Sequence, residues 1–284
     1  MKSAENTYLK RIASLVGEGN YQRALETFVS AQRAPNETLD ALAYRLGVSR
    51  IIEQRLPFEG GLFRLSHDEL VIRLNIDSSF ARKRFTLAHE IGHLLLHTVP
   101  AFRGSRGADA ALERTCDMIA AELLMPATET SSFVHGLGTP SPEKLRAVAS
   151  RFGVSVQAAA IRIRDSLKLW KFSIGMWTAG PNVRTLWFIA PRKWQYEKPS
   201  LGSVERALSS NSSTSTNEWW ECAQYTERVW LNLLRVGTAS VLGLVDFAKD
   251  TKAQKNQAQN SRGQVRSTQG PHENDQVTAT SKER

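Results

Sequence analysis

Two histidines and a glutamate stand at a spacing suited to metal chemistry in the string RFTLAHEIGHLLLH, residues 84–97. His89, Glu90 and His93 form an HExxH motif within it. On a helix, residues four apart lie on one face, so His89 and His93 can each present a ring nitrogen to one zinc ion. Glu90 then points to the side, within reach of a water on that ion, and can act as the general base of peptide-bond hydrolysis.

A catalytic zinc site of this kind needs a third protein ligand. The string ERTCDMIAAELLMP offers Glu113 and, four residues later, Asp117. Glu113 can complete a His₂Glu site that leaves the fourth position to water, and Asp117 can accept a hydrogen bond from the far nitrogen of a ligand histidine. The alternative is a solvated acidic helix face. His97, four residues after His93, has a possible role near the metal, but the sequence favours a helix-end histidine that meets the last carbonyls.

Two neighbouring helices have to position these side chains. Apolar residues at helical spacing predict a helix over residues 77–97, with Ser78 or Ser79 as its cap. They predict a second helix over residues 110–124, which Pro126 ends.

The segment before the first motif carries strand signals. A short helix is expected over residues 36–47, with Asn36 as its N-cap. Short alternating or apolar runs then predict strands over 48–56, 61–65 and 70–74. The strand at 70–74 is a candidate for main-chain pairing with an extended substrate, and equally for an ordinary place in a sheet.

The rest of the chain changes in composition. Proline at 140 and 142 marks a boundary, all seven tryptophans lie between residues 170 and 230, and residues 249–284 contain no Leu, Ile, Met or aromatic residue. In the Trp-rich stretch we expect strands over 172–178 and 185–189 and a helix over 218–234. A segment as polar as the last one cannot bury enough apolar surface to fold.

We therefore expect an α+β chain: a helical, zincin-like core with a small antiparallel sheet, followed by a helix pair and an α/β accessory region. The predicted regions are N-terminal helices at 1–35, a zinc metallopeptidase core at 36–135, a helix-turn-helix-like pair at 140–167, a Trp-rich accessory region at 168–248 and a disordered tail at 249–284.

Composition narrows the setting. The chain has 284 residues, only two cysteines and a net charge of +9, of which residues 127–284 carry most. No apolar stretch reaches the roughly 20 residues of a membrane span, and charges occupy the place of a signal peptide's apolar core. We expect a soluble protein of the reducing cytoplasm.

A basic second half and a helix-turn-helix-like pair raise the question of DNA binding. The second helix of the pair begins SVQAAA, and base readout needs long polar side chains in the first turns of that helix. Only Ser155 and Gln157 qualify, so the sequence argues against direct nucleic-acid binding and favours structural packing.

The paired motifs, together with LDALAYRLGVSRIIEQRLPFEGGLFRL and LRAVASRFGVSVQAAAIRI, resemble the ImmA/IrrE family of bacterial metallopeptidases over residues 36–165. The pattern is more distantly similar to the HExxH…ExxxD arrangement of thermolysin-like enzymes. The resemblance implies a zinc site at His89, His93 and Glu113, with Glu90 catalytic and helix-turn-helix transcriptional repressors as substrates. Cys116 departs from the alanine more common in the family.

The sequence therefore predicts a regulatory zinc endopeptidase. The alternative is a non-catalytic, antitoxin-like binding module built on the same scaffold. The presence of Glu90 favours the enzyme, because a scaffold needs no general base.

Overall fold

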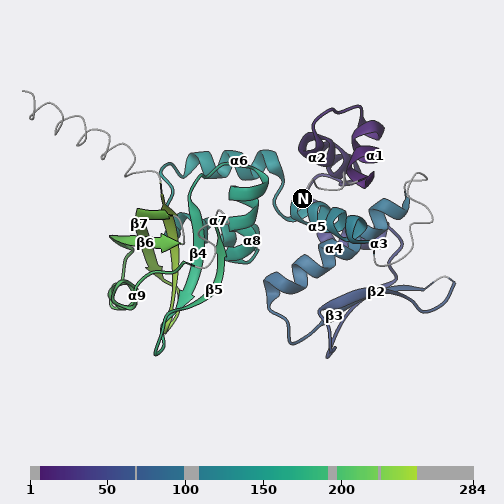
Figure 1. The fold of residues 1–284 in the computed structure, drawn as a ribbon. Coiled ribbons are helices and arrows are strands. Elements are labelled where there is room, and N and C mark those ends of the chain that lie inside the picture. Colours follow the sequence, from purple (N-terminus) through teal and green to yellow (C-terminus); the bar gives the residue numbers. More distant parts are fainter. Residues whose placement is uncertain (1–6, 68, 99–108, 191–196, 223–224, 248–284) are drawn as a thin grey trace, which may run out of the picture.

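The computed structural model describes residues 7–67, 69–98, 109–190, 197–222 and 225–247, and Figure 1 shows their arrangement. The chain mixes helices with two small sheets. The predicted tail at 249–284 lies outside the described residues. None of the helices in the described part combines the length and apolarity needed to cross a membrane.

The first two helices pack against the helix that carries Glu113. They are α1 (Thr7–Val16) and α2 (Tyr21–Gln32), and both contact α5 (Ala110–Leu124). Gly17 sits between them with φ +70°, a conformation that favours glycine. The helices expected at 1–35 are thus present from residue 7 onward, and their apolar faces join the main core.

The metal-site region contains α3 (Leu39–Arg45), β1 (Arg50–Gln54), β2 (Gly60–Arg64), β3 (Leu70–Asn75), α4 (Phe80–Thr98), α5 and α6 (Ala127–Gly136). The sheet order is β1-β3-β2, with β1 parallel and β2 antiparallel to β3. One expectation was wrong. The small sheet is mixed rather than antiparallel, because a crossover rather than a hairpin brings β3 beside β1. Of the two alternatives left open for residues 70–74, the structure has the ordinary place in the sheet: β3 is the central strand and β2 lies at the edge.

The cap of α3 also differs from the expectation. Asn36 has φ +59° and forms part of the preceding turn, whereas Thr38 accepts the hydrogen bond from the Ala41 N–H at 3.2 Å. On α4, Ser79 rather than Ser78 caps the first turn, accepting from the Arg82 N–H. The predicted bounds of α5 agree with the structure, and Asp109 is its N-cap.

One glycine sets how closely α4 approaches α5. A Cβ at Gly92 would lie 3.2 Å from the Cα and carbonyl oxygen of Cys116, tighter than ordinary contact. Gly92, the second variable position of the HExxH motif, therefore lets the two helix backbones meet at the level of the histidines.

The helix pair is α7 (Pro142–Phe152) and α8 (Val156–Ala160), joined at Gly153 in the left-handed conformation. A π-helical segment, η2 (Ile161–Ser166), continues α8 directly. Such π segments are rare and often lie at functional sites.

The C-terminal sheet has five antiparallel strands in the order β5-β4-β8-β7-β6. The strands are β4 (Ser173–Thr178), β5 (Arg184–Ile189), β6 (Thr214–Cys222), β7 (Tyr225–Arg235) and β8 (Ser240–Asp246), and α9 (Leu201–Leu208) precedes β6. The helix expected over 218–234 was wrong. Val229, Leu231 and Leu233 are buried at alternate positions, which is the period of a strand.

Tryptophan lies in the core of this sheet. Trp177 is fully buried and crosses Gly175 and Gly243, where a Cβ would come within 2.5 and 2.8 Å of its ring. Trp220 packs edge-on against Phe188, with ring centroids 6.0 Å apart. Both tryptophan rings are therefore core residues. They pack with α9 on the face of the sheet opposite the helix pair.

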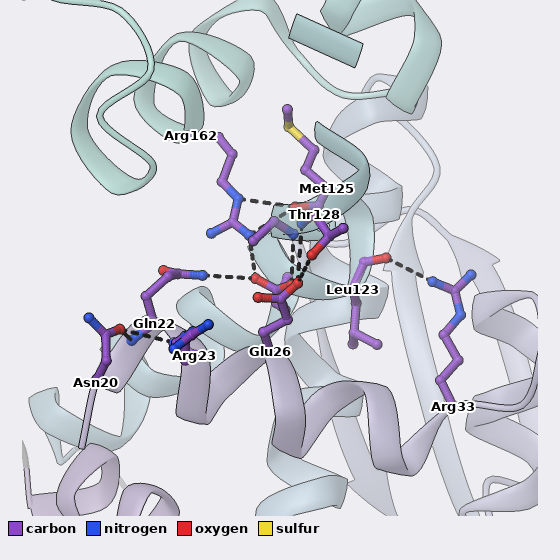
Figure 2. A network of polar contacts seen from close by, with 11 residues as sticks. Asn20, Gln22, Arg23, Glu26, Arg33, Leu123, Met125, Thr128 and Arg162 are labelled. Carbon is purple, nitrogen blue, oxygen red and sulfur yellow. Dashed lines mark hydrogen bonds and ion pairs between the residues drawn. The ribbon is translucent and has the colours of Figure 1, made fainter. Parts of the chain in front are cut away.

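A buried ion pair joins three parts of the chain (Figure 2). Arg162 of η2 pairs with Glu122 of α5, and both side chains are almost fully buried. Glu122 also accepts hydrogen bonds from Gln22 Nε2 of α2 at 3.1 Å and from the Ala127 N–H at 2.9 Å. Arg162 donates to the Met125 carbonyl oxygen at 2.9 and 3.1 Å. The N-terminal helices, the metal-site helices and η2 thus share one polar network.

An acid-sensitive contact lies beside α3. Arg45 donates two hydrogen bonds of 2.8 Å to the Glu37 carboxylate, whose side chain is 8% exposed. This guanidinium lowers the pKa of Glu37 from 4.5 to about 2. A lowered pKa stabilises the fold above pH 4.5, and that contribution is lost as the pH falls toward 2.

We therefore expect Glu37→Gln to lower the urea midpoint of unfolding at pH 7, and the deficit relative to the unaltered protein to shrink between pH 5 and pH 2. Circular dichroism across a pH series measures it. A deficit that does not change with pH would show that Glu37 acts through packing instead.

Candidate metal centre

Three side chains from two helices converge on one point. His89 and His93 lie one turn apart on α4, and Glu113 lies on the first turn of α5. The Nε2 atoms of the two histidines are 3.2 Å apart, His89 Nε2 is 3.2 Å from one Glu113 oxygen, and His93 Nε2 is 3.6 Å from the other. Among the described residues these are the His, Cys, Asp and Glu side chains whose donor atoms gather as a possible metal site.

The spacing of these donors fits a tetrahedral ion. With ligand bonds of about 2.0–2.1 Å, two ligands of tetrahedral zinc lie roughly 3.3 Å apart. The 3.2 Å between the two Nε2 atoms and the 3.2 Å from His89 Nε2 to one Glu113 oxygen are close to that edge length, and the other Glu113 oxygen lies 3.6 Å from His93 Nε2. Two nitrogens and one carboxylate oxygen are also a donor set that zinc accepts in catalytic sites. The predicted residues are thus brought together in a geometry that could hold a metal ion.

Each histidine has a partner on α5 for its far nitrogen. His89 Nδ1 lies 2.9 Å from Asp117 Oδ1, as a supporting carboxylate would require. His93 Nδ1 lies 3.4 Å from the Cys116 Sγ. If Nε2 of His93 faces an ion, Nδ1 carries the proton and donates to sulfur, a weak acceptor. The sequence predicted this role for Asp117 and gave Cys116 no role at the site.

The position of Cys116 is a consequence of helix packing. The thiol is buried between α4 and α5, and this burial raises its pKa far above the usual range. It is therefore a neutral neighbour of the imidazole rather than a thiolate ligand. The signal for this contact in the sequence is the combination of Gly92, which lets the helices meet, with a cysteine next to Asp117.

Glu90 is held apart from the three converging side chains. It is buried on α4, and burial raises the pKa of its carboxyl group above the usual range. The backbone N–H of Leu62 in β2 donates a hydrogen bond to it. A buried carboxylate beside a possible metal site, oriented by one main-chain donor, has the environment of a general base.

Burial also acts on the second histidine. Together with the nearby His89 ring, it lowers the pKa of His93, which favours the neutral form that a metal ligand needs. His97 is exposed near the end of α4 and does not join the three converging donors.

A cavity of about 360 Å³ opens at this point of the molecule. His89, Glu90 and His93 lie on one wall and Glu113 and Asp117 on another. Glu59 and Gly60, at the start of β2, border it as well. The edge strand therefore runs beside the group of side chains that could do chemistry.

Comparison with known proteins covers the same part of the chain. Residues 32–164 match the family described as "IrrE N-terminal-like domain". This match supports the resemblance of residues 32–164 to the ImmA/IrrE family. The match includes both histidines, Glu90, Glu113 and Asp117, and it leaves α1, most of α2 and the C-terminal sheet outside.

Individual relatives of this IrrE-like domain are more distant. The radiation response metalloprotease IrrE of Deinococcus radiodurans is 34% identical over 118 residues, which cover 39% of this chain. The match spans only 35% of that relative's length. A solved structure described as a Mycobacterium tuberculosis transcriptional regulator is 14% identical, with a TM-score of 0.48 over 84% of this chain and 81% of that one.

The Cys116 contact gives a prediction about metal affinity. Cys116→Ala removes the acceptor for His93 Nδ1, and partners of this kind typically change metal affinity about 10-fold or more. We expect Cys116→Ala to weaken zinc binding several-fold and Cys116→Ser, which keeps an acceptor, to weaken it less. Competition with a chromophoric chelator measures this without any substrate. Equal affinities for the two variants would mean that sulfur only fills space.

Proposed function

We propose that the protein is a zinc-dependent endopeptidase. The observation that carries this proposal is the convergence of His89, His93 and Glu113 donor atoms at 3.2–3.6 Å, with the buried Glu90 carboxylate on the same cavity. The match of residues 32–164 to the IrrE N-terminal-like family supports it. Zinc is the ion that this mixed nitrogen and oxygen donor set suits.

The proposed roles follow from the geometry. Zinc, when bound, lowers the pKa of a water and polarises the scissile carbonyl. Glu90 accepts a proton from the attacking water and later passes it to the leaving amine. Asp117 keeps the His89 ring oriented with its Nε2 toward Glu113.

The substrate is best held along β2. This strand pairs with β3 on one side, and within the described residues no strand pairs with its other side. Its Leu62 N–H reaches Glu90, so a segment lying along β2 would pass close to the general base. An extended peptide can add to such an edge by main-chain hydrogen bonds. This replaces the central strand β3 as the candidate for that role.

The biological role that we propose is a cytoplasmic regulatory protease that cleaves a helix-turn-helix transcriptional repressor. This rests on the likeness to the ImmA/IrrE family, one relative of which is named a radiation response metalloprotease. A repressor encoded beside the gene for this chain is the first substrate to test.

The test uses purified full-length protein, incubated with that repressor with added zinc and with a chelator. We expect cleavage at one bond, identified by mass spectrometry of the fragments, that stops when the metal is removed and resumes when zinc is restored. Repressor that stays intact while casein or proteome peptides are cut would overturn the substrate assignment but keep the peptidase. Absence of cleavage of any protein by the zinc-loaded chain would overturn the enzyme.

A further inference from the structure

A second cavity adjoins the proposed metal site. Its volume is about 690 Å³, and it is lined from the start of α4, the end of α5, α8 and the first residue of η2. Glu59, Arg82 and Phe85 border both this cavity and the smaller one around the histidines. The two cavities are therefore neighbours that share these three residues, and we call the larger one the α8 groove.

The α8 groove has an apolar floor. Phe85 and Leu124 come from the metal-site helices, and Ala158 and Ile161 come from the other wall. Ile161 is 43% exposed, so the groove holds a large apolar side chain without a full cover. Pockets of about 300–1,000 Å³ typically hold compact ligands on apolar surface with a few polar groups.

Polar groups form the rim. Arg82 pairs with Glu59 at 3.2 Å, and Ser78 donates to the same carboxylate at 2.5 Å. These contacts stand where the groove meets the metal cavity. They satisfy the charges at the junction. The rest of the groove combines the apolar floor with the polar side chains of Asn75, Asp77, Ser79, Ser155 and Gln157.

The position of α8 beside the groove argues against DNA binding by the helix-turn-helix-like pair. The second helix has only five residues before η2 begins. Ser155 Oγ is used to cap it, accepting from the Ala158 N–H at 3.1 Å, and Gln157 lines the α8 groove. The residues that would have to enter a DNA groove therefore face the peptidase side of the molecule.

We propose that the α8 groove is a specificity subsite that binds an apolar side chain of the protein substrate, on one side of the scissile bond. This inference rests on the proposed function, because the occupant is the same polypeptide that reaches Glu90. The shared border indicates this occupant, since a chain that follows β2 past Gly60 comes to Glu59, which lines both cavities.

The test places a charge on the exposed part of the floor. Ile161→Arg alters a residue that is 43% exposed, and Leu186→Arg is the matched control, because Leu186 is 50% exposed on β5 and does not line the groove. Both zinc-loaded variants and the unaltered protein are incubated with proteome-derived peptides, and mass spectrometry gives the residue preference at each position around the cut. The best peptide is then synthesised for kinetics.

We expect the unaltered protein and Leu186→Arg to prefer large apolar residues at one fixed position. Ile161→Arg should lose that preference and raise KM for the best peptide about 10-fold, the size of effect that an apolar pocket contact gives. Cleavage by all three proteins with the same preference would overturn the subsite and leave the peptidase standing. Failure of the unaltered protein to cut any peptide would overturn both.

Discussion

Replacing Glu90 with glutamine is expected to leave zinc bound and to lower kcat for peptide cleavage by about 10²–10⁴-fold. Glutamine has nearly the same shape and can keep the hydrogen bond from the Leu62 N–H, but it cannot accept a proton from water. The three residues with converging donor atoms are untouched by the change. Metal content by atomic emission and kcat on a cleavable peptide measure the two quantities separately.

A suitable control is Glu129→Gln, which alters an exposed glutamate on α6 that pairs with Arg151. It should cleave at the normal rate. If Glu90→Gln still cleaved normally, Glu90 would not be the general base. If cleavage stopped but the regulatory effect in cells persisted, the non-catalytic binding module considered from the sequence would become the better account.

The second large effect is expected from Arg162→Met, which breaks the buried network of Figure 2. The Glu122 carboxylate would keep its hydrogen bonds from Gln22 and Ala127 but lose its counter-charge in a nearly solvent-free place. Removing one partner of a buried ion pair typically lowers the free energy of unfolding by about 3–5 kcal/mol, because the other charge stays buried without its partner. Urea unfolding at pH 7 measures the change in the free energy of unfolding.

The matched comparison is Arg55→Met, since Arg55 pairs with Asp77 at 3.0 Å on the exposed surface. That loss should stay within about 1 kcal/mol. A double variant, Glu122→Gln with Arg162→Met, should regain a good part of the lost stability because no buried charge remains unpaired. A cost for Arg162→Met as small as that for Arg55→Met would show that the network does not hold these three parts together.

The chemistry-bearing helices could be predicted from the sequence because their signals are local. His89, Glu90 and His93 fall on one turn, and the α5 bounds follow from helical periodicity and the proline after it. The approach of Glu113 to the histidines depends on tertiary structure. The spacing of the two motifs led us to expect it, but it is the packing of α4 on α5 that brings the donor atoms together.

Other features depended on contacts that are distant in the sequence. The order of strands β1, β3 and β2 is not encoded in any one segment, so the sequence left open whether residues 70–74 form an edge strand or an interior one. Residues 218–234 contain apolar residues that fit a helical period as well as an alternating one, and pairing with β8 decides for strands. The α8 groove is lined by Phe85 and Ile161, which are 76 positions apart in the sequence. No local sequence pattern could therefore predict the groove.

The most direct test of the metal centre is a crystal structure of the zinc-loaded protein with anomalous data at the zinc edge. We expect one ion per chain, about 2.0–2.2 Å from His89 Nε2, His93 Nε2 and a Glu113 oxygen, with one remaining position open to solvent. A zinc peak elsewhere, or a Glu113 carboxylate that points away from both imidazoles in the loaded protein, would contradict the account.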